Sequence, residues 1–193
     1  MKHGGQEMDE ATLQLNLWLT QGLVLTVAAC SSLWVHGLGA TLGLFAYPGW
    51  SSMGWAGCVV AMIVLASIAM EKYLPKRWQD DGSVNQRIFG SMSPWMTLLV
   101  CVSVGVGEEW LFRGVIQTFA GNFWTSVVFT VVHVRYLAKP LLVASVFGTS
   151  WLLGMLFIHA NSLWSPIMAH IGIDLLLAFY LQAILKKERG EKE

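Results

Sequence analysis

Charged residues are scarce in this chain, and one long part of it has none. Asp, Glu, Lys and Arg make up 12% of the 193 residues, whereas 55% are hydrophobic and the mean hydropathy is +0.56. From Ala11 to Met70 there is no Asp, Glu, Lys or Arg at all, which allows two membrane spans of about 20 residues with a turn between them. This composition excludes an ordinary soluble domain. We expect an integral protein of the lipid bilayer.

Cysteines are few, the formal net charge is zero, and no cleavable leader is expected. Cys30, Cys58 and Cys101 lie at unrelated spacings in apolar segments, which excludes a disulfide framework and a cysteine-based metal knuckle. Twelve basic and twelve acidic residues cancel, so the charge does not indicate nucleic acid as a partner. Residues 1–10 are polar and no small-residue cleavage site follows a short apolar core, so we expect no signal peptide and a first span that is retained.

Apolar segments separated by turn residues predict an all-α polytopic membrane helix bundle with about six transmembrane helices. The first five expected spans cover residues 13–35, 53–73, 94–119, 123–137 and 141–158, and the sixth follows a turn at 161–166 and ends at the basic tail. The fourth is short for a full crossing. Residues 71–87 are polar and predict a solvated loop, and Gly121-Asn122 predicts a tight turn. We expect one membrane domain over residues 1–193.

The basic residues predict the orientation of the bundle, because short loops rich in Lys and Arg are retained on the cytoplasmic side. With the N-terminus inside, every basic segment lies on that side. These segments are Lys2, the loop with Lys72, Lys76, Arg77 and Arg87, the turn with Arg135 and Lys139, and the tail from Lys186. The remaining turns have no Lys or Arg, so we expect both termini in the cytoplasm.

Three of the twelve acidic residues, Glu108, Glu109 and Asp174, fall within apolar spans. Each needs an explanation, because a charged side chain at the centre of a membrane helix costs about 2.5–3.5 kcal/mol on insertion scales. On a helix, Glu109 and Arg113 are four residues apart and share a face, so they can form an ion pair. Glu108 points about 100° away and uses Arg113 less easily, which leaves it as the candidate reactive carboxylate.

Two histidines lie in the same apolar part of the chain. His133 follows Phe129 by one helical turn in the fourth span, and His170 precedes Asp174 by one turn in the sixth. A carboxylate at that spacing can orient the imidazole, or both groups can face one substrate. The third, fourth and sixth spans therefore each carry polar groups, and we expect these to converge between the helices.

Three ordered motifs carry a family resemblance. They are Glu108-Glu109-x-x-x-Arg113, Phe129-x-x-x-His133 and His170-x-x-x-Asp174. In order and spacing they resemble the CPBP family, which comprises the CAAX prenyl endopeptidases and the bacteriocin-processing or bacteriocin-immunity proteins of the Abi type. The resemblance covers residues 94–180, the expected catalytic core. One departure is the last motif, which in the family more often ends in Asn.

The resemblance implies a membrane-embedded peptidase acting on a membrane-associated peptide or protein. Glu108 would activate a water molecule, and His133 would position that water or carry its proton. His170 and Asp174 would stabilise the oxyanion. The ion pair of Glu109 and Arg113 would hold the helix that carries Glu108 in register. The resemblance also implies a bacterial cell membrane as the location.

Other interpretations stay open. Glu108, His133 and His170 offer one carboxylate and two imidazoles, which can form a zinc site with an open fourth position. No His-Glu-x-x-His helix is present, however, so we favour a glutamate-activated water over Zn. A non-catalytic immunity or regulatory membrane protein is the main alternative, and a small transporter or proton relay is another. No oligomeric state is predicted.

Overall fold

The computed structural model describes residues 9–78 and 83–190, and every regular element within them is helical, which confirms the all-α class. Lys2, used above for the orientation, lies outside the described residues. In sequence order the elements are α1 (Glu10–Gly43), α2 (Trp50–Tyr73), a 3₁₀ turn (Lys76–Trp78), α3 (Val84–Phe89), α4 (Pro94–Leu111), a π-helical turn (Phe112–Ile116), α5 (Gln117–Val132), a 3₁₀ turn (Val134–Tyr136), α6 (Pro140–Ala160) and α7 (Trp164–Gly190).

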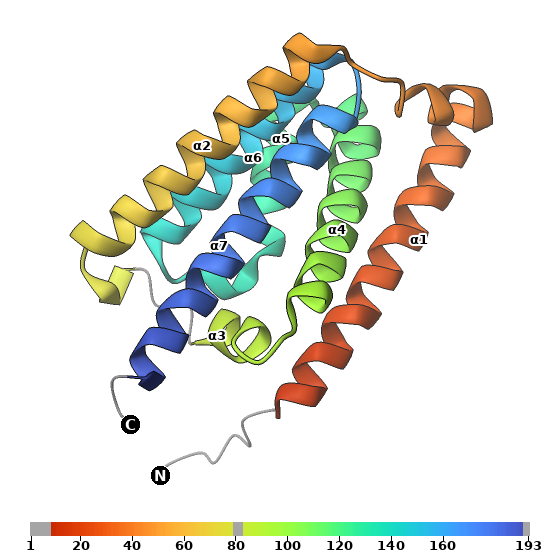
Figure 1. Ribbon diagram of the computed structural model, residues 1–193. Coiled ribbons are helices and arrows are strands. Elements are labelled where there is room, and N and C mark those ends of the chain that lie inside the picture. Colours follow the sequence, from red (N-terminus) through yellow and green to blue (C-terminus); the bar gives the residue numbers. More distant parts are fainter. Residues whose placement is uncertain (1–8, 79–82, 191–193) are drawn as a thin grey trace.

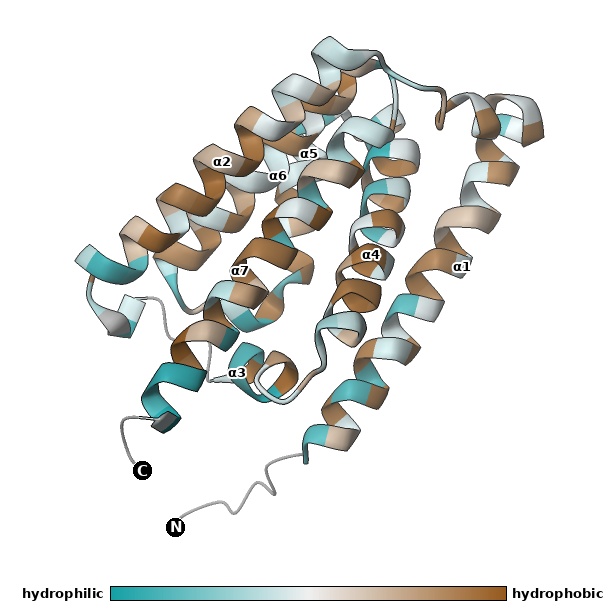
Figure 2. Ribbon diagram, in the orientation of Figure 1, coloured by the Kyte–Doolittle hydropathy of each residue, from teal (hydrophilic) through white to brown (hydrophobic). Residues whose placement is uncertain are grey.

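The first helix illustrates why these segments require a membrane. α1 begins where the Asp9 carboxylate accepts a hydrogen bond from the N–H of Thr12 at 2.8 Å, and hydrogen bonding from Thr12 lowers the pKa of this carboxyl. Large apolar side chains along α1, such as Leu19 and Leu23, are more than half exposed. Apolar residues also cover most of the helices elsewhere in the bundle (Figure 2). Surfaces of this kind are stable when lipid covers them.

Five helical stretches of the described residues are long and apolar enough to cross a membrane. The third of them, Pro94–Val132, contains a residue with non-helical backbone angles, Gly121, at φ 68° and ψ 171°. This conformation is essentially restricted to glycine, so the turn predicted at this position is confirmed. The stretch therefore holds two helical segments, which correspond to the third and fourth spans expected from the sequence.

Contacts at the two ends of the bundle show that the chain reverses at Gly121. Before the turn, Gly114 lies against Leu44 and Leu163, close to the loops that join α1 to α2 and α6 to α7. After the turn, Arg135 donates a hydrogen bond to Asn85 of α3 at the opposite end, at 3.2 Å. The first turn of α1 and the last turn of α7 lie at that same end (Figure 1), as six passes require.

The fourth span is shorter than predicted. It was expected to reach residue 137, but the helix ends at Val132, and His133 has non-helical angles of φ −81° and ψ 52°. From Gly121 to this end the helix is about 16 Å long at 1.5 Å per residue, roughly half of a membrane core. A 3₁₀ turn follows at Val134–Tyr136, and Pro140 then opens α6 and holds Lys139 extended.

The polar segment predicted as a solvated loop is partly helical. α2 continues to Tyr73, and α3 occupies Val84–Phe89. Gln182 of α7 donates hydrogen bonds to the Phe89 and Met92 carbonyls at 2.8 and 3.2 Å, which fixes the segment after α3 against α7. α3 therefore packs across the end of the bundle where α1 begins and α7 ends (Figure 1).

The opposite end of the bundle is held closed by hydrogen bonds between two connections. The N–H of Leu163 donates to the Leu44 carbonyl at 2.8 Å, and the Ser162 hydroxyl donates to the Ala46 carbonyl at 2.6 Å. The indole N–H of Trp164 donates to the Phe45 carbonyl at 2.8 Å. These bonds join the α1–α2 connection to the start of α7 and close this end.

Candidate active site

Glu109 is the centre of a buried polar network. Its side chain is completely buried, and one carboxylate oxygen, Oε2, lies 3.0 Å from Nε of Arg113. The other oxygen, Oε1, accepts a hydrogen bond from Nδ1 of His170 at 2.8 Å. The ion pair with Arg113 confirms the pairing predicted from the four-residue spacing. The contact with His170 was not predicted, because spacing along one helix carries no information about a partner on another.

Arg113 also forms hydrogen bonds to Ser150 on α6. Its Nη2 group donates to the carbonyl of Ser150 at 3.0 Å and lies 3.2 Å from the Ser150 hydroxyl, both on α6. The guanidinium carbon lies 5.2 Å from the centre of the Phe129 ring, in cation–π contact. Arg113 thus joins α4, α5 and α6 around the carboxylate.

A π-helical turn carries this arginine. Phe112–Ile116 is a π-helical turn, in which hydrogen bonds join residues five positions apart. Such turns inside longer helices are frequent at functional sites. His36 of α1 lies 2.8 Å through Nε2 from the carbonyl of Gly114, and since a carbonyl only accepts, Nε2 is the donor. The α1 helix therefore fixes the π-turn from outside, through a residue that the sequence did not single out as part of the site.

The remaining candidate residues face a cavity of about 490 Å³ inside the bundle. Glu108, His133, His170 and Asp174 all line it, which confirms the predicted convergence of the third, fourth and sixth spans. Among the residues that the structure describes, no hydrogen bond or ion pair joins the Glu108 side chain to another residue. The two adjacent glutamates therefore have different surroundings: Glu109 is engaged behind the cavity wall, and Glu108 faces the cavity.

Both histidines use the same ring nitrogen, Nδ1, as a hydrogen-bond donor to the protein. Nδ1 of His133 lies 2.6 Å from the carbonyl of Phe129, so this nitrogen carries a hydrogen, as does Nδ1 of His170 toward the Glu109 carboxylate. In each ring Nε2 is left for other partners. For His170 that atom lies 3.6 Å from Oδ2 of Asp174, one turn along α7. The predicted proximity of these two residues is confirmed, but Glu109 makes the shorter contact with the imidazole.

The backbone is irregular around His133, where it lines the cavity. Backbone that is not helical is tolerated at membrane depth only where protein buries it or where it lines an aqueous space. His133 sits at the end of a helix that is too short to cross, and Tyr136 stacks on it with ring centres 6.1 Å apart. Both residues line the cavity. The cavity therefore leaves space beside the Glu108 carboxylate that is large enough for a water molecule.

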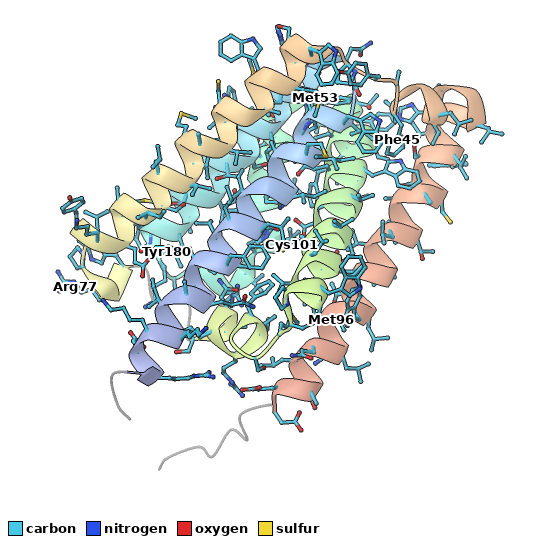
Figure 3. All side chains as sticks on the ribbon, viewed as in Figure 1. Phe45, Met53, Arg77, Met96, Cys101 and Tyr180 are labelled. Atoms are coloured by element: carbon cyan, nitrogen blue, oxygen red, sulfur yellow. The ribbon has the colours of Figure 1, made fainter. Side chains whose placement is uncertain are left out.

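A second cavity of about 650 Å³ adjoins the first. They share lining residues on five elements, among them Ser67, Tyr136 and Leu142. The second cavity also meets charged residues, Arg77 and Glu188 among them. In Figure 3 Arg77 lies far from Phe45, which marks the closed end. The site therefore opens toward the end of the bundle that carries α3 and the last turn of α7.

The zinc alternative can be tested against the arrangement of the side chains. In the described ranges no group of three or more His, Cys, Asp or Glu side chains is close enough to hold one metal ion. Glu108, His133 and His170 line one cavity without forming such a group. The residues as arranged do not fit a three-ligand zinc site, so no step below is assigned to a metal.

Several residues of the site escaped the sequence analysis. Ser150 holds Arg113, His36 holds the π-turn, and Gln21 of α1 lines the cavity. Ionisable groups within apolar spans are the signal that indicated the other site residues. Buried Ser and Gln in the same spans are a further signal, because uncharged polar groups also need partners in a bilayer.

Together the fold and the site define a class: a polytopic helical membrane protein with a buried Glu–Arg–His network behind a cavity that carries carboxylate and imidazole groups. Residues 90–176 match the family described as Rce1-like, type II CAAX prenyl endopeptidase Rce1-like. This match covers the part of the chain that carries the three motifs and confirms their resemblance to CAAX prenyl endopeptidases. The family and the five long apolar helices make it an integral membrane protein.

One curated relative has a comparable core. Over 125 residues the chain is 38% identical to a Bacillus subtilis (strain 168) protein named "Uncharacterized protein YpbD". The alignment covers 64% of this chain and 66% of the relative, so it spans slightly less than two thirds of that protein. No solved structure matches the sequence.

Proposed function

We propose that this protein is an intramembrane endopeptidase that hydrolyses a peptide bond in a membrane-associated peptide or protein. The observation that carries the proposal is the division between the two glutamates. Glu109 is held by Arg113 and His170, whereas Glu108 lines the cavity together with His133 and His170. A carboxylate that no other side chain engages, in a cavity with room for water, is the arrangement that general-base catalysis requires.

The reaction follows from these positions. Glu108 takes a proton from a water molecule as the water oxygen attacks the carbonyl carbon of the scissile peptide bond. Nε2 of His133 accepts a hydrogen bond from the same water, because its Nδ1 hydrogen is committed to the Phe129 carbonyl. When the C–N bond breaks, the proton held by Glu108 passes to the leaving nitrogen, which completes a hydrolysis without a covalent intermediate.

The oxyanion formed by the attack needs a donor on the other side of the substrate carbonyl. With a hydrogen on each ring nitrogen, His170 is a cation beside the Glu109 and Asp174 carboxylates, and its Nε2–H can supply this bond. Glu109 sets the ring orientation through Nδ1, and Asp174 lies beside Nε2 at 3.6 Å. In this assignment Glu108, His133 and His170 are catalytic residues, and Glu109, Arg113 and Asp174 are positioning residues.

Three synthetic probes test the activity with purified protein in liposomes: a farnesylated C-terminal peptide, the same peptide without the lipid, and a single-span membrane peptide. Mass spectrometry identifies products. Glu108→Gln is expected to lower kcat/KM by about 10²-fold or more, as general-base loss does. The matched control is Glu10→Gln, the same chemical change at an exposed residue outside the cavity. Cleavage of any probe at an equal rate by wild type and Glu108→Gln would contradict the proposal.

Other outcomes separate the alternatives. Loss of cleavage with a chelator and its recovery with added zinc would favour the metal mechanism over the water activated by Glu108 alone. Protection of cells against a bacteriocin that survives both Glu108→Gln and His133→Ala would favour an immunity protein. Proton flux in liposomes that depends on Glu108 would favour a relay.

We place the protein in a bacterial cell membrane with both termini in the cytoplasm. The Bacillus relative and the distribution of Lys and Arg support this location and orientation. Labelling of single cysteines introduced at Lys72 and at the exposed Ser51, in a protein whose three native cysteines are replaced by serine, tests the orientation in intact cells. An impermeant reagent should reach the second position and not the first.

A further inference from the structure

A buried amide on α1 has no function in the site as described so far. Gln21 is 5% exposed, and its side-chain oxygen Oε1 has no hydrogen-bond partner among the described residues. Buried polar groups in proteins are almost always hydrogen-bonded, because an unpaired group loses its bonds to water without replacement. Gln21 therefore requires a partner that the described residues do not supply.

The position of Gln21 brings it to the catalytic cavity. Gln21 and Leu17 are the α1 residues that line the cavity, and of the two only Gln21 can form side-chain hydrogen bonds. Leu25, one turn after Gln21, packs against Gly107 of α4, where an added Cβ would lie 3.3 Å from Cγ of Leu25. Both helices start at the same end of the bundle (Figure 1), so Gln21 is level with α4 about one turn before Glu108.

A primary amide has the chemistry of a peptide bond. It has donors on nitrogen and an acceptor on oxygen, and so it complements the carbonyl and N–H groups of a peptide backbone. An extended substrate is often held by backbone hydrogen bonds to the edge of a β-sheet, but the described residues form no strand. In this helical cavity a side-chain amide can take over that role.

We propose that Gln21 binds the backbone of the substrate peptide next to the scissile bond. The inference rests on the proposed peptidase function and extends the site to α1, which lies outside the residues that match the family. It assigns Gln21 to substrate binding and not to the association of α1 with α4, because no side-chain hydrogen bond links Gln21 to α4 in the described structure.

The test compares Gln21→Leu with Gln14→Leu, the same change two turns earlier on α1 and outside the cavity. The probe is whichever of the three peptides the wild-type protein cleaves fastest. Loss of one neutral hydrogen bond is expected to raise KM about fivefold in Gln21→Leu and to change kcat less. The melting temperature should stay equal to that of the wild type or rise, because a buried unpaired polar group is removed.

Backbone esters identify the substrate atom involved. Esters replace single N–H groups of the probe, one position at a time on each side of the cleaved bond. For one position the ester should raise KM about fivefold with the wild type and have no further effect with Gln21→Leu. Effects that add in every combination, an unchanged KM, or an equal rise in Gln14→Leu would each overturn the proposal. Absence of cleavage by the wild type would instead refute the peptidase function itself.

Discussion

The buried pair of Glu109 and Arg113 gives a prediction of measurable size. Both side chains have no exposed surface, and their charged groups lie 3.0 Å apart. Removing one partner of a buried pair typically costs about 3–5 kcal/mol, because the other charge is left without compensation. For Arg113→Met we expect about 3 kcal/mol, the lower limit, since the Glu109 carboxylate keeps its hydrogen bond from His170 at 2.8 Å.

The double variant separates the pair from its neighbours. In Glu109→Gln/Arg113→Met no unpaired charge remains, the introduced amide oxygen can still accept from His170, and methionine fills the space beside Phe129. We therefore expect the double variant to lie within about 1 kcal/mol of the wild type, whereas Glu109→Gln alone should lose about 3 kcal/mol by leaving the guanidinium unpaired.

The free energy of unfolding can be followed in mixed detergent micelles through the ten tryptophans of the protein. Lys186→Met removes an exposed charge and serves as the control, with an expected change below about 0.5 kcal/mol. If the double variant lost the sum of the two single losses, the two residues would not be energetically coupled, and the network described around Glu109 would be refuted.

Three further predictions concern positions outside the catalytic groups. Gly121→Ala should destabilise the protein by about 1–3 kcal/mol, because φ of 68° with ψ of 171° suits only glycine; an unchanged melting temperature would contradict the reversal at this residue. Gly154→Ala should cost about 1–3 kcal/mol, because the added Cβ would overlap the side-chain oxygen of Asn122 and lie 2.8 Å from the side-chain oxygen of Gln117. In the control, Gly148→Ala on the same helix, the added Cβ meets open space, and the variant should be neutral or slightly stabilising. Equal stability of these two variants would contradict the close approach of α5 and α6. His36→Ala should cost about 1 kcal/mol through the lost bond to the Gly114 carbonyl, measured by unfolding, and His159→Ala, whose ring makes only an edge contact with Trp55 at 6.4 Å, should cost less.

The fold could be predicted closely because a bilayer restricts the choices. Long apolar stretches must be helices in lipid, and Gly121-Asn122 is a turn in both the sequence and the structure. The end of the fourth span could not be predicted. Its sequence has no Gly or Pro between Phe123 and Lys139, so no local residue marks the helix end at Val132.

The site was predicted in its members and only partly in its contacts. Glu109 and Arg113 share one helix, so their spacing alone indicated the ion pair. Glu109 and His170 are 61 positions apart, and no local pattern indicates that they meet. The same holds for Arg113 with Ser150, and for Gln21, which is one uncharged polar residue among many until the cavity beside it is known.

The amino-acid pattern alone is enough to indicate a membrane helix bundle and to single out Glu108, Glu109, His133 and His170. It could do so because charge in hydrocarbon is costly and therefore conspicuous. Spacing along the helix already indicated that Glu109 pairs with Arg113, but the contact of Glu109 with His170 and the cavity that Glu108 lines depend on how α7 and α5 pack against α4. Helix spacing fixes neighbours along one helix, but partners on different helices are fixed by packing.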